Sequence, residues 1–447
     1  MNVGDPRGAD IAARALAGHR RFRGKIQMAP KVPVGGSEDF ALWYTPGVAA
    51  VSRAIAADPA ASFDLTGRGD TVAILTDGSR VLGLGDIGPE AALPVMEGKA
   101  LLFKMLGGVD AVPVCVEASG ADELIAIARA IAPGFGAINL EDIATPACFR
   151  VLEALQETLP IPVWHDDQQG TAVAALAGLR RSLALTGRRL GEVRIAFVGI
   201  GAANMATCRL LRAAGADPVR MVACDSTGTL HTGRADIEAA RETLPEKWAI
   251  CRETNPERIA GGIAEALRGA DVCLAFSQPG PGTIPPEAVA GMAPRAIVFA
   301  CANPVPEIWP EDALAAGAEI VATGRSDFPN QVNNALAFPG LFRGVLDARA
   351  RRITDAMALA AADALVRRAE SLSADGPGMI LPPIEDRLAA AEVAAAVAYA
   401  AQQAGEARRA VDPEEVRANT LSRTGAAAEL AAGIAARAGV PWPVPEG

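Results

Sequence analysis

The chain has 447 residues, 50% of them hydrophobic, and this length predicts two or three domains around a large buried core. The formal net charge of −10 without a basic stripe argues against nucleic acid as a partner, and seven scattered cysteines without a Cys-x-x-Cys pair argue against a disulfide framework or a zinc site. No run is apolar and long enough to span a bilayer, and the N-terminus lacks the layout of a signal peptide, so we expect a soluble, cytoplasmic protein without a membrane partner.

The N-terminal region offers one candidate functional side chain. Residues 1 to about 25 are predicted to form a basic helix, which we interpret as a packing surface or a subunit contact. Tyr44 is one of only two tyrosines and precedes a Pro-Gly turn and a helix that begins at Val48. Because a lone tyrosine most often anchors a loop, this segment alone does not indicate a site.

A strand at 71–76, a glycine-rich segment at 83–88 and a helix at 94–105 are predicted next. The glycines permit close approach of the backbone to a ligand, but the segment lacks the helix start of a dinucleotide site. Pro94 is expected in the first turn of the helix. Lys104 is interpreted as a solvated helix lysine, and the local pattern alone does not distinguish Lys99 from it.

From residue 110 onward, predicted strands alternate with predicted helices. This alternation predicts a parallel sheet with right-handed crossovers. The strands are expected at 112–116, 137–140 and 161–164, and the helices at 122–131 and 146–155. A helix over 171 to about 185 is expected to link this domain to the next.

Two neighbouring strands of this sheet end on paired acids. Glu141 and Asp142 follow one strand, and Asp166 and Asp167 follow the next. The carboxyl ends of parallel strands meet at one edge of a sheet, so we expect four carboxylates at one crevice. Such acids repel one another unless a cation lies between them. Oxygen ligands favour a hard divalent ion, Mg²⁺ or Mn²⁺.

A second unit has the layout of a dinucleotide site. A strand at 193–198 leads into a glycine-rich turn, a helix at 205–214 and a strand at 219–224 that ends on an acid. The third glycine of the usual G-x-G-x-x-G pattern is replaced by asparagine. We expect the pyrophosphate of a dinucleotide at the N-terminus of this helix. The candidate cofactor-binding residues are Gly199, Gly201, Ala202, Ala203, Asn204 and Asp225.

The remaining strands are predicted at 272–276, 296–300 and 319–322, in the same sheet. Asn303 follows the second of them, and Asn333 and Asn334 precede a predicted helix, where they could cap it or bind a carboxylate or amide. Alanine-rich helices are expected at 350–372 and 386–402, and a charged, peripheral helical tail from about 403. The chain is thus expected to be an α/β protein with an N-terminal parallel-sheet domain (1–170), a Rossmann-like, doubly wound domain (171–405) and a tail (406–447).

Taken together, these segments resemble the short bacterial malic enzymes. The motif that starts at Tyr44 is similar to the tyrosine motif of that family, and the segments 83–88 and 94–99 resemble its lysine motif. The segments 138–143 and 165–168 resemble its metal motifs, and 302–304 and 324–334 its later signatures. The likeness runs in order from about residue 18 to 405.

The resemblance implies oxidative decarboxylation of L-malate to pyruvate and CO₂, with reduction of NAD(P)⁺, by a homodimer or larger homo-oligomer. Lys99 would be the general base on the C2 hydroxyl, Tyr44 the acid that protonates C3, and Asp166 an electrostatic support for the lysine. The metal ligands, for Mg²⁺ or Mn²⁺, would be Glu141, Asp142 and Asp167. Arg80, Asn303 and Asn334 would contact substrate, and Asn303 and Asn333 the cofactor.

The chain departs from the family pattern in three ways: Gln169 stands where histidine is usual, Asn204 replaces a glycine, and Ser226 and Thr227 follow Asp225 where many relatives carry a basic residue. Asp225 would bond the ribose 2′-hydroxyl and repel a 2′-phosphate, which favours NAD over NADP. Two alternatives stay open. One is a non-catalytic protein that senses a nucleotide or metabolite. The other is a malate dehydrogenase or malolactic activity without release of pyruvate and reduced cofactor.

Overall fold

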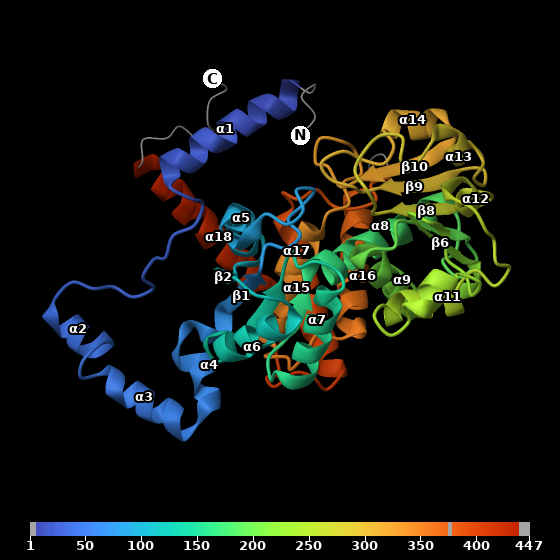
Figure 1. Ribbon diagram of the computed structural model, residues 1–447. Coiled ribbons are helices and arrows are strands. Elements are labelled where there is room, and N and C mark those ends of the chain that lie inside the picture. The colour runs from blue at the N-terminus through green and yellow to red at the C-terminus, as the bar shows by residue number, and fades with distance from the viewer. Residues whose placement is uncertain (1–5, 374–377, 438–447) are drawn as a thin grey trace.

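The computed structural model describes residues 6–373 and 378–437, and it contains two α/β units side by side with long helices packed between them (Figure 1). Residues 1–5 of the predicted basic helix lie outside the described residues, and 6–22 are helical, as expected. No described helix is long and apolar enough to cross a membrane.

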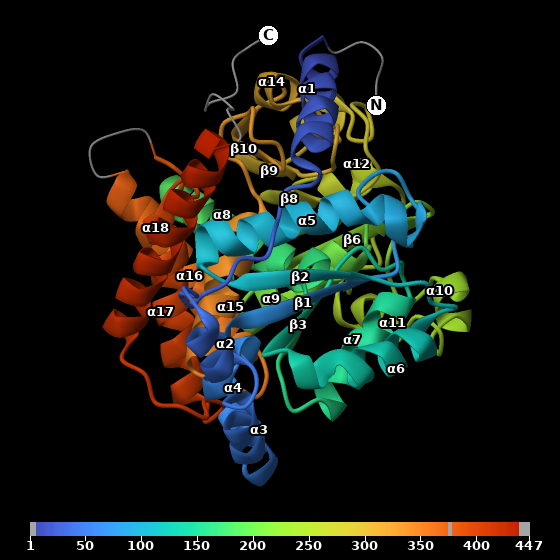
Figure 2. The same ribbon diagram turned by 90° about the vertical axis from the view of Figure 1, so that its left-hand side faces the viewer.

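The first sheet has four parallel strands in the order β2-β1-β3-β4. Val72 and Ile74 of β1 pack toward one face, and Ala73 and Leu75 pack toward the other. Helix α5 covers the first face and helices α6 and α7 cover the second (Figure 2). Burial on both faces is typical of parallel sheets and explains the nearly continuous apolar strands. The elements are β1 (Thr71–Thr76), α5 (Gly88–Gly107), β2 (Asp110–Cys115), α6 (Ala121–Ile131), η3 (Ala132–Gly134), β3 (Ala137–Leu140), α7 (Ala147–Thr158) and β4 (Val163–His165).

Helix α5 begins at Gly88, so the prediction that Pro94 stands in its first turn is wrong. Pro89 occupies that turn, where the missing N–H has no intrahelical partner to lose. Pro94 lies inside the helix, where it costs one backbone hydrogen bond and is tolerated because the rest of α5 is anchored by buried side chains.

The second sheet has the order β10-β9-β8-β5-β6-β7, with only the short β7 antiparallel. The chain leaves β5 toward β6 on one side and later returns to β8 on the other side. The doubly wound arrangement expected from the sequence is therefore confirmed. The strands are β5 (Ile195–Val198), β6 (Met221–Asp225), β7 (Gly228–Thr229), β8 (Val272–Ala275), β9 (Ala296–Ala300) and β10 (Ala318–Thr323). The surrounding helices are α9 (Ala202–Ala213), η5 (Pro218–Arg220), α10 (Ala235–Ala239), α11 (Pro245–Glu253), α12 (Ile263–Leu267), α13 (Pro286–Ala290) and α14 (Pro310–Ala315).

Long helices connect the two units through one continuous hydrophobic core. At the seam between α15 and α17 the backbones touch: a Cβ on Gly340 would lie 2.3 Å from the carbonyl oxygen of Ala390, and one on Gly344 would lie 2.3 Å from that of Ala394. Alanine-rich sequence in this region therefore serves close helix packing. These elements are α8 (Thr171–Thr186), η6 (Asn334–Leu336), α15 (Phe338–Asp347), α16 (Asp355–Leu372), α17 (Arg387–Gln403) and α18 (Pro413–Arg437).

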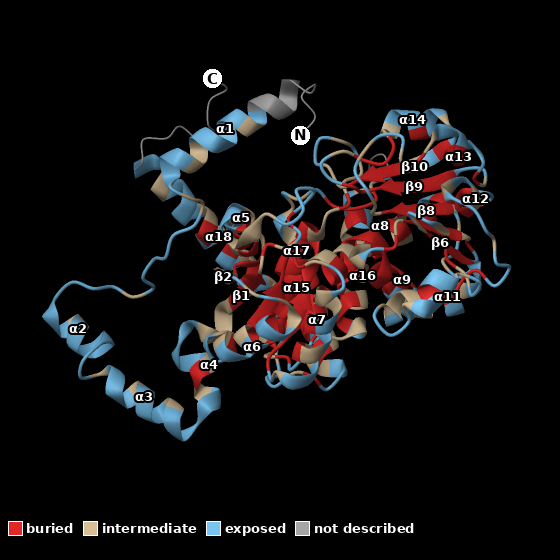
Figure 3. Cartoon of the chain, viewed as in Figure 1, coloured by how far each residue is buried: buried red, intermediate tan, exposed pale blue. Residues whose placement is uncertain are grey.

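Residues 11–57 contain no buried side chain, and we call residues 6–57 the N-terminal arm. Its helices α1 (Pro6–Phe22), α2 (Ser37–Trp43) and α3 (Val48–Ala57) extend away from the two sheets (Figures 1 and 3). Large apolar side chains are nevertheless exposed on the arm, including Phe40, Leu42, Trp43 and Val48. The arm thus lacks a hydrophobic core of its own.

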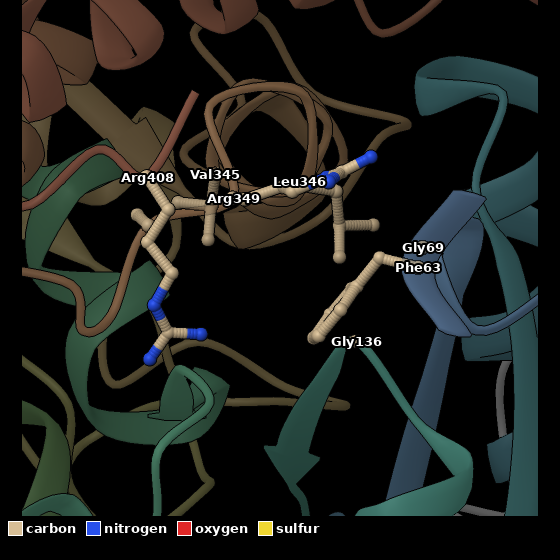
Figure 4. Close-up of a pocket in the computed structure, with 8 residues that line it drawn as sticks. Phe63, Gly69, Gly136, Val345, Leu346, Arg349 and Arg408 are labelled. Atoms are coloured by element: carbon tan, nitrogen blue, oxygen red, sulfur yellow. The ribbon is translucent and has the colours of Figure 1, made fainter. Parts of the chain in front are cut away.

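The arm joins the body through η1 (Pro59–Ala61), α4 (Ser62–Leu65) and η2 (Gly67–Asp70). Here the Phe63 ring lies between the guanidinium groups of Arg68 and Arg349, 4.2 and 5.8 Å from its centroid. A cavity of about 10 Å³ remains beside it, bounded by Leu346 and Arg408 (Figure 4). That volume holds about one water molecule, so this cavity is not a candidate substrate site.

Replacing glycine by alanine should have opposite effects on stability at the seam and at an uncrowded position of α18. Gly344→Ala should lower the free energy of unfolding by about 2 kcal/mol, because the added methyl group has no space between the helix backbones. Gly425→Ala in α18 should raise it by about 0.5–1 kcal/mol, because nothing lies within 4 Å of that Cβ position and alanine favours the helix. Denaturant unfolding of both variants measures this difference. Equal effects would contradict the packing described here.

Candidate active site

The four predicted carboxylates meet at the carboxyl edge of the first sheet, where β3 and β4 pair in parallel. Lys99, on the buried face of α5, lies between two of them: its Nζ is 2.8 Å from Oε1 of Glu141 and 2.6 Å from Oδ2 of Asp166. Asp167 accepts a hydrogen bond of 2.8 Å from the backbone N–H of Asp142. The structure therefore brings Lys99 and all four acids into one cluster.

Lys99 is 8% exposed, and its ammonium lies 4.4 Å above the ring of Phe338. Burial by itself would lower the pKa of Lys99. The charges of Asp166, Glu141 and Asp167 outweigh that effect, and the net shift of the pKa is upward. In this arrangement the lysine is a protonated counter-ion.

Burial raises the pKa values of Glu141 and Asp166, and the Lys99 ammonium only partly offsets this. Burial, followed by repulsion from Asp167, raises the pKa of Asp142 to about 7. Asp142 Oδ2 is buried without a hydrogen-bond partner, and this residue adopts a left-handed backbone conformation with φ 53°. The cluster is thus short of positive charge and has an unsatisfied oxygen.

A short π-helical turn, η4 (Asp166–Gly170), positions Asp166 ahead of α8. The indole N–H of Trp164 donates a 3.3 Å hydrogen bond to Oδ1 of Asp166. A Cβ at Gly170 would lie 1.8 Å from that same oxygen, so only glycine leaves room for the carboxylate. Gly170 is therefore required by the close approach of its backbone to Asp166.

Gln169, which replaces a histidine of the family pattern, supports the strand end. Its Oε1 accepts a 3.1 Å hydrogen bond from the backbone N–H of His165. The His165 ring is buried with both nitrogens unpartnered, and Nδ1 lies 3.7 Å from Oδ2 of Asp167. Burial lowers the pKa of His165. Sequence reasoning gave this histidine no role, since a single buried histidine has no distinguishing pattern.

Among the predicted substrate residues, Arg80 is exposed at the start of the loop before α5, and its charge lowers the pKa of Asp142 in part. The segment that begins with Asn334 packs against η4. Asn303 lies at the end of β9, where its carbonyl oxygen approaches Gly83 of the first domain. Asn333 caps η6, because its Oδ1 accepts a 2.9 Å hydrogen bond from the N–H of Ala335.

Tyr44 is separated from this cluster within the chain. It is 71% exposed and stands between α2 and α3 of the N-terminal arm (Figures 1 and 2). Of the three predicted catalytic residues, the structure therefore joins Lys99 and Asp166 but leaves Tyr44 outside.

The predicted dinucleotide turn follows β5. Gly199 has a φ of 77°, and Gly201 precedes the first turn of α9, so Ala202 and Ala203 present their N–H groups at the helix start. Asn204 is fully buried, and its side-chain amide donates to the carbonyl oxygens of Val198, Gly199 and Leu274 at 2.6–3.2 Å. The asparagine thus joins the turn to β5 and β8, which the glycine of the usual pattern does by close packing alone.

The turn is close to the acid cluster, because α9 packs against η4. An anion at the N-terminus of α9 would therefore lie near the edge of the first sheet. This contact brings the predicted cofactor turn and the predicted metal acids next to each other, where the two domains meet.

Asp225 ends β6 beside a cleft of about 650 Å³. No basic residue follows Asp225 closely in the sequence, but two bases reach it from further along the chain. Arg234 contacts both of its carboxylate oxygens at 3.1 Å, and Lys247 Nζ lies 2.5 Å from Oδ2. Burial would raise the pKa of Asp225, but these cations and the N–H of Thr227 hold it below its usual value. Arg234 precedes α10 and Lys247 lies in the first turn of α11, 9 and 22 residues after Asp225 (234 − 225 and 247 − 225), so a short sequence window misses them.

Comparison with known proteins identifies two domains. Residues 23–121 match the malic enzyme N-terminal domain, and residues 168–402 match the malic enzyme NAD binding domain. The chain is 44% identical over 416 residues to the bifunctional malic/malolactic enzyme of Bacillus subtilis, covering 93% of this chain and 98% of that enzyme. It is 45% identical to the NAD-dependent malic enzyme of Geobacillus stearothermophilus, over 86% and 78% of the two chains.

Solved structures show the same relationship. The malic enzyme of Entamoeba histolytica superposes with a TM-score of 0.92 at 43% identity, over 96% of this chain and 89% of that one. The malic enzyme of Pyrococcus horikoshii superposes with a TM-score of 0.90 at 46% identity, over 96% and 99%. With both domains matched in order and the fold shared over nearly its whole length, the chain belongs to the malic enzyme family.

Proposed function

We propose that the chain catalyses the oxidative decarboxylation of L-malate to pyruvate and CO₂, with reduction of NAD(P)⁺. The observation that supports this most directly is the buried Lys99, held between carboxylates at the edge of a sheet that faces a dinucleotide-binding unit. The relatives are named as NAD- and NADP-dependent malic enzymes, which favours catalysis over a sensor without turnover.

Lys99 is the proposed base that takes the proton of the C2 hydroxyl while hydride passes to the nicotinamide. To act in this way it must be neutral, but the surrounding acids hold its pKa above the ordinary value. A cation bound by those acids would lower the pKa of Lys99 again. The proposed base therefore depends on a cation in the cluster.

Glu141, Asp142 and Asp167 are the proposed ligands of Mg²⁺ or Mn²⁺. Among the described residues, no group of three or more acidic, histidine or cysteine side chains is already arranged around a common point as metal ligands. The donor set still fits a hard ion: all ligands are carboxylate oxygens and one is unsatisfied. The raised pKa values of Glu141 and Asp142 indicate missing positive charge. When bound, the ion would polarise the C2 oxygen and stabilise the negative charge that develops on decarboxylation.

The proposed substrate contacts lie around the cluster. Arg80 is exposed beside Asp142 and would pair with a malate carboxylate, for which guanidinium geometry is suited. Asn334 is close to η4, and Asn303 faces the first domain from the end of β9. Asn303 and Asn333 are further proposed as cofactor contacts, with the capping role of Asn333 fixing its loop.

Tyr44 is the proposed acid that protonates C3, supplied by a second copy of the chain. Two observations support this: residues 11–57 of its arm contain no buried side chain, and the arm exposes Phe40, Leu42 and Trp43. Contiguous exposed apolar side chains mark an interaction surface, and a homo-oligomer would cover them. The site would then be complete only in a dimer or larger assembly.

NAD is the proposed preferred cofactor, because the negative charge of Asp225 at the expected ribose position would repel a 2′-phosphate. Arg234 and Lys247 reduce that repulsion, so the preference should be modest. A cytoplasmic location is proposed as well, since all seven cysteines are free thiols, as a reducing compartment maintains them.

Removal of Lys99 tests the proposed chemistry. Lys99→Ala should lower malate oxidation by at least about a thousandfold through loss of the base. The control is Lys104→Ala on the same helix, whose ammonium is 39% exposed and paired with Asp110, and which should keep near-parental activity. The assay follows reduced nicotinamide and pyruvate together, with and without Mn²⁺. Parental rates in Lys99→Ala would contradict the base assignment, and lactate without free reduced cofactor would indicate malolactic activity.

Mixing two inactive variants tests the origin of Tyr44. In a dimer with exchanged arms, one Tyr44→Phe chain and one Lys99→Ala chain form one intact site and one doubly altered site. Refolded or co-expressed equimolar mixtures should regain about a quarter of the parental activity per chain, since half of the dimers are mixed. Each variant alone stays slow. A mixture without recovery would mean that Tyr44 serves its own chain or no chain.

The contacts of Asp225 predict a change of cofactor preference. Asp225→Ser removes the repelling charge and frees Arg234 and Lys247 for a 2′-phosphate, so kcat/KM for NADP⁺ relative to NAD⁺ should rise about ten- to hundredfold. Asp236→Ser serves as the control, because it removes the other, exposed partner of Arg234 and leaves Asp225 in place. An unchanged ratio in Asp225→Ser would show that this acid does not face the ribose.

A further inference from the structure

Glu307 is a buried acid outside the carboxylate cluster, and its side chain is fully enclosed. Its Oε1 accepts hydrogen bonds from the backbone N–H and the hydroxyl of Ser277, at 2.7 and 2.9 Å, and its Oε2 accepts one of 3.0 Å from the N–H of Ala302. All of these groups can donate, which suits an ionised carboxylate. Burial raises the pKa of Glu307, and these hydrogen bonds oppose that shift by stabilising the charged form. Within residues 6–373 and 378–437, no cation forms an ion pair with it.

A buried charge without a counter-ion is costly, so its location indicates what it serves. Ser277 belongs to the loop after β8, and Ala302 to the loop after β9. The backbone carbonyl of Glu307 also accepts the N–H groups of Gly282 and Ile284, at 3.1 Å each. One residue therefore holds two adjacent loops at the carboxyl edge of the second sheet.

These loops lie on one side of the dinucleotide turn. Asp225, at the expected ribose position, ends β6 on one side of β5, whereas β8 and β9 lie on the other side. A dinucleotide that crosses the sheet edge at the turn of Gly199 must place its nicotinamide over β8 and β9. Gly199 contacts this loop directly, since a Cβ there would lie 2.6 Å from that of Ser277. The Ala302 loop continues into Asn303, next to Gly83 of the first domain.

We propose that Glu307 is a positioning residue for the nicotinamide end of the cofactor. Its carboxylate fixes the loops of Ser277 and Ala302, and its uncompensated negative charge favours the oxidised nicotinamide, which is a cation, over the reduced ring, which is neutral. The second effect acts through the field of the charge and needs no direct contact.

The test compares equilibrium binding of NAD⁺ and NADH to the full-length protein without malate. Glu307→Gln should weaken NAD⁺ binding more than NADH binding. The dissociation constant for NAD⁺ divided by that for NADH should rise on the order of tenfold, as expected for unit charges about 10 Å apart at an effective dielectric constant of about 20. The matched control is Glu287→Gln, the same charge change on an exposed residue of α13, which should leave both constants unchanged. An unchanged ratio in Glu307→Gln would overturn the proposed charge effect.

A second variant keeps the carboxylate and tests the loops. Ser277→Ala removes one hydrogen-bond donor to Oε1 of Glu307. It should weaken the binding of NAD⁺ and of NADH about threefold each, so the ratio of the two dissociation constants should stay parental. It also keeps the proposal testable if the amide of Glu307→Gln, which would face N–H donors, prevents folding. Parental affinities for both forms in Ser277→Ala would overturn the positioning role. Both variants are judged on cofactor binding, so failure of the proposed malate chemistry leaves their outcome readable.

Discussion

The structure depends on a group of like charges that cannot be stable alone. Four carboxylates converge where β3 and β4 end, and Lys99 supplies the one ammonium between Glu141 and Asp166. Desolvation penalises every member, so each carboxylate pKa with a resolved shift moves toward the neutral form. The remaining deficit of positive charge is what makes the cluster suitable for a divalent ion and an anionic reaction.

The cofactor unit treats its charges differently. Asp225 forms ion pairs with two cations, whereas the carboxylate cluster contains one ammonium group. Glu307 forms no ion pair with any of the described residues. Asp225 and Glu307 therefore have different local potentials along the edge of the second sheet. Because hydride transfer removes a positive charge from the nicotinamide, such a gradient bears directly on which redox form the crevice retains.

Local sequence patterns predicted every described strand except the short β7 to within two residues, and the acids at the strand ends, because apolar runs and polar endings are local features. They failed where contacts are distant in sequence. Arg234 reaches Asp225 from the start of α10 and Lys247 reaches it from α11, and Glu307 lies in a segment without a motif. Tyr44 was recognised by its motif, but no sequence pattern indicated that it stands on an arm without buried side chains. The domain boundaries at 170 and 405 stay predictions.

The glycine seam between α15 and α17 has a consequence for how this sequence can change. Gly340 and Gly344 already have no side-chain atoms, and the facing Ala390 and Ala394 have one each. Any substitution at the two glycines adds atoms to a space that is already full. Every such substitution is therefore expected to destabilise the protein. Because one hydrophobic core runs from this seam into both sheets, an ancestral pairing of these helices would be preserved even while loops around the crevice diversify.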